Sequence, residues 1–135
     1  LFEKSLDLGL IPFSVVSNTA VIGMNYTHLG IGLNIMHFAF IADCVKIGNG
    51  TLINAYASIH HDVTIGNFCE ISPKVVILGG ACVGDLTSIG AGAIVLPDIK
   101  VGTNSVIGAG SIVTKDVGDN EIWCGNASKF IKSRI

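Results

Sequence analysis

The sequence predicts an all-β fold in which short parallel strands coil into a triangular prism of about five 18-residue coils. Three observations predict it. An apolar residue recurs at every sixth position, a column of uncharged residues lies two positions earlier, and glycine follows the apolar residue in every third hexad. Neither an α-helix nor a hairpin sustains a period of six with a super-period of eighteen. A chain of 135 residues is long enough for one such domain with a buried core.

The apolar column runs without an insertion from Leu29 to Val113. All of its members are Ile, Leu or Val, which chance would produce with odds on the order of one in a million. They are Leu29, Ile35, Ile41, Ile47, Ile53, Ile59, Ile65, Ile71, Ile77, Val83, Ile89, Val95, Val101, Ile107 and Val113. Side chains two apart on a strand share a face, so this column and the one from Thr27 to Ser111 both point into the prism.

Glycine follows the apolar residue at positions eighteen apart, which are Gly30, Gly48, Gly66, Gly84 and Gly102. Because glycine adopts backbone conformations closed to other residues, we expect a tight corner at each of them. Three hexads therefore make one coil, and the coils stack at the ~4.8 Å spacing of neighbouring strands. Asn49, Asn67 and Asp85 form a second corner column, expected to be structural because Asn and Asp tolerate left-handed turns.

The hexad phase fails at both ends, where Gly23 and Asp119 occupy the apolar positions. A solenoid exposes strand edges at its ends and needs caps there. We therefore expect the repeat domain over residues 21–117, an N-terminal cap over residues 1–20 and a C-terminal cap over residues 118–135. Residues 128–135 are expected to form a short closing helix.

Composition and charge narrow the classes of function. Apolar residues make up 50% of the chain, and only 13% of the residues are charged. A formal net charge of −2 leaves no basic surface for nucleic acid, and no run of about eighteen apolar residues is present to span a membrane. So few charges on a small protein indicate that part of its surface is covered by further copies of itself.

The cysteines Cys44, Cys69, Cys82 and Cys124 form no Cys-x-x-Cys pair and have no histidine at zinc-finger spacing. We therefore expect free, buried thiols, no metal, and a location in the reducing cytoplasm.

The ladder of Ile/Leu/Val-Gly hexads resembles the hexapeptide-repeat acyltransferases, whose prism is a left-handed parallel β-helix. Residues 59–73, IHHDVTIGNFCEISP, are similar to the signature of the sialic-acid O-acetyltransferases and bacillosamine-type sugar acetyltransferases within that superfamily. The resemblance covers nearly the whole chain. It implies acetyl-CoA as co-substrate, a sugar or nucleotide sugar as acceptor, and a homotrimer with active sites between subunits. The left-handed sense rests on the resemblance alone, because parallel crossovers are otherwise right-handed.

Two features depart from this family. Its sugar enzymes carry an N-terminal nucleotide-sugar-binding domain, of which residues 1–18 resemble only the last element. Residues 1–20 are therefore either a cap or a remnant of that domain. The family's Gly-x-Pro-Ala-Lys run near the C-terminus is Gly125-Asn126-Ala127-Ser128-Lys129 here, without the proline.

Residues eighteen apart stack on one corner of the prism, and one such column contains His61, Gly79, Pro97 and Lys115. Its three steps cover about 14 Å, close to the reach of a pantetheine arm from its thioester to its phosphates. The column predicts a base at His61, close backbone approach at Gly79 and a phosphate-binding cation at Lys115.

Acyl transfer from a thioester to an amine or hydroxyl needs a base that removes one proton, and histidine titrates near neutrality. The resemblance gives Asp62 the role of raising the basicity of His61. Adjacent side chains on a strand point apart, so this pairing requires a bent corner. His60 is the competing candidate for the base. The backbone N–H of Gly79 is expected to face the thioester oxygen.

The resemblance also implies acetyl-CoA contacts at Glu70, Ala91 and Ala109, and Asn54 is expected to hydrogen-bond the acceptor. Ala91 and Ala109 are eighteen apart and lie on a different corner from His61. A cofactor that touches both corners lies between neighbouring subunits, which fits the threefold trimers of this family.

The sequence thus favours an acetyl-CoA-dependent sugar N- or O-acetyltransferase. One alternative is a non-catalytic trimeric assembly module, against which the corner histidine argues. Another is a γ-class carbonic anhydrase on the same prism. That enzyme needs three histidine ligands on one metal, at a spacing that the histidines of this chain do not supply: His28, His37, His60 and His61.

Overall fold

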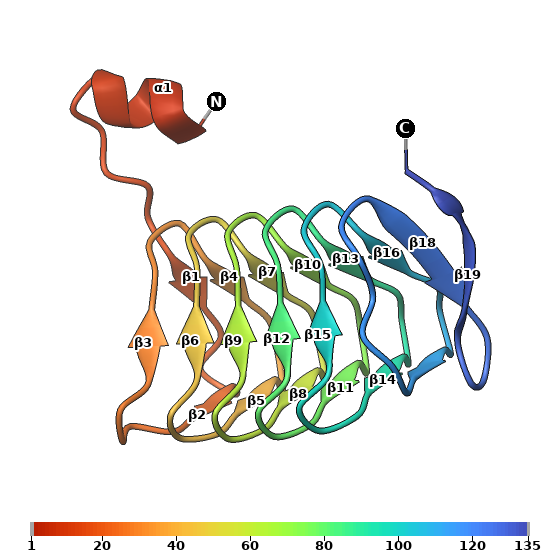
Figure 1. The fold of residues 1–135 in the computed structure, drawn as a ribbon. Helices are drawn as coiled ribbons and strands as arrows, with labels where there is room; N and C mark the ends of the chain where they lie inside the picture. Colours follow the sequence, from red (N-terminus) through yellow and green to blue (C-terminus); the bar gives the residue numbers. More distant parts are fainter. Residues whose placement is uncertain (1, 135) are drawn as a thin grey trace.

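The computed structural model describes residues 2–134 and consists of one short helix followed by stacked strands (Figure 1). Helix α1 spans Phe2–Asp7, and each strand from β1 to β17 is two residues long. These strands form three parallel sheets, which are the walls of a triangular prism. The chain winds in the left-handed sense as it advances from the N-terminal to the C-terminal end of the prism, as the family resemblance implies (Figure 1).

Each wall takes every third strand. Wall A contains β1 (Val15–Val16), β4 (Asn34–Ile35), β7 (Leu52–Ile53), β10 (Glu70–Ile71), β13 (Ser88–Ile89) and β16 (Val106–Ile107), and continues into β18 (Glu121–Cys124) and β19 (Lys129–Ser133). Wall B contains β2 (Val21–Ile22), β5 (Phe40–Ile41), β8 (Ser58–Ile59), β11 (Val76–Ile77), β14 (Ile94–Val95) and β17 (Ile112–Val113). Wall C contains β3 (His28–Leu29), β6 (Lys46–Ile47), β9 (Thr64–Ile65), β12 (Cys82–Val83) and β15 (Lys100–Val101).

The prism has about six coils rather than about five, and its strand pairing starts at Val15, ahead of the residue-21 boundary expected from the hexad phase. Val15 and Val16 pair with Asn34 and Ile35 although they precede the regular hexads. Strand pairing requires only backbone hydrogen bonds, such as that from the Val15 N–H to the Leu33 carbonyl at 2.8 Å. A coil therefore forms where the side-chain repeat is already lost.

The two predicted columns form the core. Every member of the apolar column from Ile35 to Val113 is at most 3% exposed. Leu29, the first member, is 38% exposed because it lies on the first strand of wall C, at the open N-terminal end. The six-residue period therefore locates the core, except in its first member.

Several polar members of the second column are buried and hydrogen-bonded. The hydroxyls of Thr51, Thr87 and Ser105 donate to main-chain carbonyls of the following corner at 2.8, 2.7 and 2.8 Å. All three residues are fully buried. Since a buried hydroxyl is costly only when it has no partner, the core accepts these residues without a penalty for unmade hydrogen bonds.

The repeated glycines permit close stacking and do not make the left-handed turn that the sequence suggested. None of the five has a positive φ; that conformation falls two residues later, as at Gly50 (φ 64°) and Phe68 (φ 53°). A Cβ on Gly48 would lie 2.6 Å from the carbonyl carbon of Gly66 and 2.7 Å from the amide nitrogen of Asn67. The next coil occupies the space that a side chain would need.

Asn49, Asn67 and Asp85 are structural, but for a different reason from the one expected. Their φ angles are not left-handed. Instead, a side-chain oxygen of each accepts the backbone N–H of the residue one coil earlier, at 3.0 Å for Ile31 to Asn49 and 2.8 Å for Asn49 to Asn67. The Asn67 N–H donates likewise to Asp85 at 2.7 Å. These side chains thereby accept hydrogen bonds from backbone N–H groups at the corners, which take no part in strand pairing.

Gly48→Ala tests the close stacking. We expect it to lower the free energy of unfolding by about 3 kcal/mol, because the added methyl group meets backbone atoms that cannot rotate away. The matched control is Gly110→Ala, whose Cβ would have no atom within 4 Å and which bears only the strain of a φ of 66°, about 1–2 kcal/mol. Urea unfolding at one protein concentration compares the two, and equal losses would contradict the stacking role.

The C-terminal segment is a strand, so the expected closing helix over residues 128–135 is wrong within the part that the structure describes. β19 pairs antiparallel with β18, and β18 pairs parallel with β16 (Figure 1). An unpaired β16 would present a row of free N–H and C=O groups at the end of wall A. β18 forms hydrogen bonds with this edge and β19 pairs with β18, whereas a helix of the same residues would not pair with the edge.

The four cysteines are free, as expected, but only Cys69 is buried. Burial raises the pKa of the Cys69 thiol, which keeps it in the neutral form of a small core residue. Cys44 and Cys82 are half-buried and Cys124 is exposed. Within residues 2–134, none of the helical structure has the length and hydropathy that a membrane crossing requires.

Candidate functional site

His61 and Gly79 lie on one corner of the prism, between walls B and C. They follow β8 and β11, which are neighbouring strands of wall B. The Gly80 N–H donates to the His61 carbonyl at 3.0 Å. A Cβ on Gly79 would lie 2.6 Å from Cε1 and 2.7 Å from Nε2 of His61. The imidazole therefore occupies the space that a side chain at position 79 would take.

A carboxylate orients the His61 ring. Nδ1 of His61 lies 2.8 Å from Oδ2 of Asp62, and the two side chains are 70% and 64% exposed. The pair meets because Asp62 has a φ of 61°, which bends the chain at the corner. A carboxylate only accepts hydrogen bonds, so Nδ1 carries the hydrogen, and in the neutral ring the lone pair is on Nε2. This arrangement leaves a base at Nε2, on the side of Gly79.

The backbone N–H of Gly79 donates to no acceptor among the described residues, whereas those of Leu78 and Gly80 donate to carbonyls at 3.0 Å. At the matching positions of the next corner, an Asn or Asp side chain one coil later accepts the amide. Here the residue one coil later is Pro97, which has no acceptor in its side chain. The Gly79 N–H is thus available to a ligand beside the His61 ring.

His60, the competing base, lies in a different environment. Its Nε2 is 3.4 Å from the Ser58 hydroxyl, and its ring packs edge-on against Phe40 with centroids 6.1 Å apart. Ser58 and Phe40 are the first residues of β8 and β5, whose side chains face outward from wall B. His60 therefore lies over wall B, whereas His61 lies on the corner with Asp62.

Asp43 precedes His61 by one coil in the same column, but its carboxylate binds a residue of the coil before Asp43 rather than His61. Its Oδ1 accepts the Asn25 backbone N–H at 3.1 Å, and its Oδ2 accepts the Asn25 side-chain amide at 3.0 Å. The hydrogen bond from the Asn25 side chain, followed by the one from its backbone, lowers the pKa of Asp43. Asp62 is therefore the carboxylate that contacts His61.

The remaining predicted contacts lie elsewhere on the prism. Asn54, Ala91 and Ala109 are on the corner between walls A and B, where the Gly110 N–H donates to the Ala91 carbonyl at 2.9 Å. Glu70 is the exposed first residue of β10 on wall A. One chain thus brings together His61, Asp62 and Gly79, but not these other residues.

Lys115 stands where the regular stacking ends. Val113 pairs with Val95 at the usual spacing of 113 − 95 = 18 residues, but Val117 bridges to Val101 at 117 − 101 = 16. The last corner is therefore shorter than those before it, and Asp116 in it accepts the Lys100 N–H at 2.8 Å. The column of equal steps from His61 does not extend regularly through Lys115.

Lys115 instead lines a pocket of about 300 Å³ at the end of the prism, which we call the C-terminal pocket. Thr114 and Lys115 contribute to it from the last corner, and Trp123 and residues 127–130 contribute from the β18–β19 hairpin. Of these residues, only Lys115 was predicted to bind a ligand. The modified Gly-x-Pro-Ala-Lys run at residues 125–129 was the signal that the hairpin belongs to this site.

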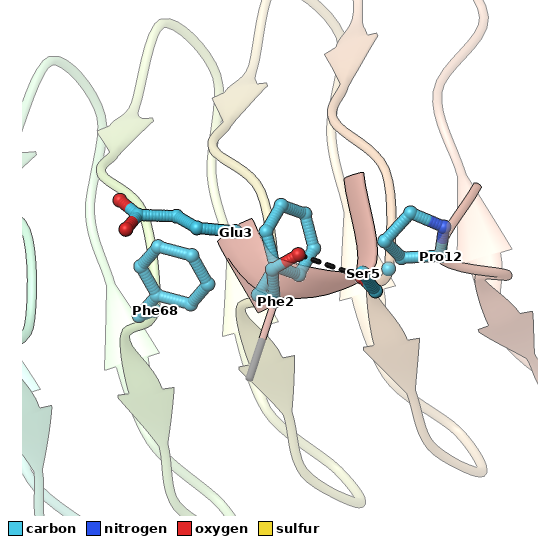
Figure 2. A pocket seen from close by; sticks show the side chains of 7 residues that line it. Phe2, Glu3, Ser5, Pro12 and Phe68 are labelled. Atoms are coloured by element: carbon cyan, nitrogen blue, oxygen red, sulfur yellow. Dashed lines mark hydrogen bonds between the residues drawn. The ribbon is translucent and has the colours of Figure 1, made fainter. Parts of the chain in front are cut away.

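A larger pocket, of about 640 Å³, lies on the corner between walls C and A, beneath α1 (Figure 2). The Phe2 ring contacts Phe68 edge-on with centroids 5.1 Å apart, and the Ser5 hydroxyl donates to the Phe2 carbonyl at 2.6 Å. Gly32 lines the same space, because a Cβ there would lie 2.8 Å from the Phe2 ring. None of the predicted site residues lines this pocket, which serves to seat α1 against the coils.

Over residues 2–134, no three His, Cys, Asp or Glu side chains are grouped closely enough to hold a metal ion.

Comparisons with known proteins relate the repeat to a family of enzymes. The family described as "Bacterial transferase hexapeptide (six repeats)" matches residues 44–79 and 80–115, which is more than half of the chain. A comparison with curated protein sequences gives no match.

Solved structures share the whole fold. A histidine variant of perosamine N-acetyltransferase from Caulobacter crescentus, in complex with CoA and GDP-perosamine, is 28% identical with a TM-score of 0.94. The alignment covers 97% of the present chain and 62% of that protein. The acetyltransferase domain of PglB from Neisseria gonorrhoeae, in complex with acetyl coenzyme A, is 26% identical with a TM-score of 0.92, and the coverages are 96% and 62%.

A third structure shares the fold alone. An aspartate variant of AntD, an N-acyltransferase from Bacillus cereus, is 22% identical, with a TM-score of 0.84 and coverages of 98% and 89%. The present chain spans only 62% of the length of the two N-acetyltransferases that it resembles at higher identity.

Proposed function

Because the chain belongs to the bacterial transferase hexapeptide family, we propose that it transfers an acetyl group from acetyl-CoA to an amine or hydroxyl of a sugar or nucleotide sugar. The observation that carries the proposal is the corner where Asp62 orients the His61 ring and leaves Nε2 beside the free N–H of Gly79. The solved structures of similar fold support the substrate class, since their acetyltransferases bind CoA, acetyl-CoA and a nucleotide sugar.

Each residue of the His61 corner has its own role in the proposed acyl transfer. Acetyl-CoA, when bound, supplies the acetyl group as a thioester. Nε2 of His61 removes the proton from the acceptor nitrogen or oxygen as its new bond to the acetyl carbon forms. The protonated His61 then returns that proton to the sulfur as the carbon–sulfur bond breaks. The Asp62 carboxylate stabilises the imidazolium between these steps, and the Gly79 N–H donates to the acetyl oxygen as negative charge develops there.

Acetyl-CoA binding extends from this corner toward the C-terminal end of the prism. In this proposal Lys115 provides positive charge for the CoA phosphates, and Glu70, Ala91 and Ala109 contact acetyl-CoA. Asn54 hydrogen-bonds the acceptor. Ala91, Ala109 and Asn54 are on a different corner from His61, so a site that uses all of them forms between two subunits.

A homotrimer would bring the two corners together, and the outer surfaces of the walls favour it. The outward side chains of wall C are mostly polar, whereas those of wall B are mostly apolar. The wall B set is Val21, Phe40, Ser58, Val76, Ile94 and Ile112. Wall B lies between the corner of His61 and the corner of Ala91, so a copy packed against it covers the site as well as the apolar surface. We place the protein in the cytoplasm, where its four cysteines stay reduced.

Release of the CoA thiol tests the proposed function. The protein is incubated with acetyl-CoA and a panel of amino-sugar nucleotides, free thiol is followed with time, and oligomeric state is measured by light scattering. We expect thiol release that depends on the acceptor, from a trimer. A trimer that binds CoA but uses no acceptor would contradict the sugar assignment. A trimer that binds no CoA would favour the non-catalytic assembly module.

A further inference from the structure

The hydrophobic core is open at the N-terminal end of the prism. The inward residues of the first coil are Val16, Ile22 and Leu29, which pair with buried isoleucines of the second coil. Val16 is 46% exposed and Leu29 is 38% exposed, whereas those isoleucines are at most 3% exposed. Because the walls shield an inward side chain on its sides, this exposure is toward the end of the prism. The three residues form an apolar surface, which we call the N-terminal end surface.

The same end presents unpaired strand edges. β1, β2 and β3 are the terminal strands of walls A, B and C, and each has a neighbouring strand on one side only (Figure 1). The Val15 and Ser17 N–H groups donate to the second coil, so the alternation along a strand directs the Val16 N–H toward the open end. Free N–H and C=O groups along three strand edges are a template for pairing with further strands.

The described part of the chain, residues 2–134, covers only the opposite end of the prism. Helix α1 lies back along the corner between walls C and A, where Phe2 contacts Phe68. At the C-terminal end, β18 pairs with wall A, Asn126 bridges to wall B and Val117 bridges to wall C. With one open end and one covered end, contacts cannot repeat from copy to copy into a filament. An association through the open end therefore joins two copies and closes.

The sequence around the N-terminal end surface favours a second copy of the same surface as its partner. Residues 8–42 contain no Asp, Glu, Lys or Arg, although 13% of the whole chain is charged. A charged partner would find no opposite charge here, whereas two copies of this surface meet without repulsion. The cores of protein interfaces are depleted of charged residues in the same way.

We propose that two copies of the protein associate through their N-terminal end surfaces, about a two-fold axis perpendicular to the prism. Val16, Ile22 and Leu29 of one copy pack against those of the other and close both cores. The two-fold axis makes facing strands run antiparallel, so their free edges can pair. Where three prisms pack side by side, as in the proposed homotrimer, the contact joins two trimers into a closed assembly of six chains. The contact does not depend on the proposed function, because no residue of the His61 corner takes part in it.

Light scattering over a dilution series, with the unaltered protein and two lysine variants, tests the proposal. We expect the unaltered protein to have twice the mass of Val16→Lys and of Leu29→Lys at equal concentration. In a separated copy the new lysine reaches water through the open end, so the variant folds. In the pair its charge would be buried without a partner, which prevents association. Circular dichroism checks that each variant is folded.

The matched control is Ile131→Lys, which places the same charge at an exposed apolar position of β19, at the covered end of the prism. We expect it to keep the doubled mass. A mass of one or three chains for the unaltered protein at every concentration would overturn the proposal without reference to any variant. A doubled mass that persists in both folded lysine variants, or that is lost in Ile131→Lys, would also overturn it. A doubled mass of two chains rather than six would contradict the proposed homotrimer and support the end-to-end contact.

Discussion

His61→Ala is expected to lower the turnover number for acetyl transfer at least about a hundredfold, with CoA affinity nearly unchanged. In the proposed mechanism the substitution removes the base at Nε2, while the Gly79 N–H and Lys115, to which we assign binding alone, remain. The loss should therefore fall on the turnover number and not on CoA binding. Initial rates of thiol release and calorimetric titration with CoA measure the two quantities separately.

His60→Ala is the matched control, because it removes the neighbouring imidazole, which contacts Ser58 and Phe40 over wall B. We expect it to retain most of the activity. The reverse ranking, with His61→Ala active and His60→Ala inactive, would assign the base to His60. Asp62→Asn keeps the size of the side chain but not its charge, so it should lower turnover by less than the loss of His61 does.

Ile71→Ala is expected to destabilise the protein by about 2–5 kcal/mol, which is the usual cost of removing a large buried aliphatic side chain. Ile71 is fully buried in the middle of wall A, with β7 and β13 on either side of its strand. Each coil of a solenoid packs only against its neighbours, so a cavity here weakens two coil interfaces at once. Urea unfolding at a fixed protein concentration measures the loss.

Ile11→Ala makes the same chemical change where the side chain is 82% exposed, and it should alter stability by less than about 0.5 kcal/mol. Similar losses for Ile71→Ala and Ile11→Ala would mean that the six-residue column is not the source of stability. The comparison removes the same atoms in both variants, so it isolates the effect of burial.

The repeat made the fold predictable because its information is local and regular. Each hexad fills one wall, and neighbouring coils pair at a constant interval, as Glu70 does with Ser88. Because the spacing is constant, the number of residues between two positions predicts how far apart they lie in space. For this reason His61 and Gly79, which are eighteen residues apart, could be placed on one corner. The hexads did not reveal the strand at Val15, because backbone pairing continues beyond the side-chain repeat.

The contacts within the site depended on torsion angles and on non-repeating segments. Asp62 contacts His61 because its φ is 61°. A positive φ also occurs at bulky residues such as Tyr56 and Phe68, so the residue type at a position does not predict this conformation. The C-terminal pocket depends on a hairpin whose residues have no six-residue period. The short basic run over residues 128–135 is compatible with a helix in sequence alone. It forms strand β19 because β18 pairs with the edge of β16 and β19 pairs with β18.

By itself, the order of residues dictated a three-walled coil, its buried columns and the corner that carries an imidazole, since strands at fixed spacing stack in only one register. Three-dimensional packing alone determined which carboxylate contacts that imidazole, why glycine is required where coils nearly touch, and that Ser128 is buried beside two lysines. These features arise from backbone torsions and from contacts between segments outside the repeat, where distance along the chain no longer reports distance in space.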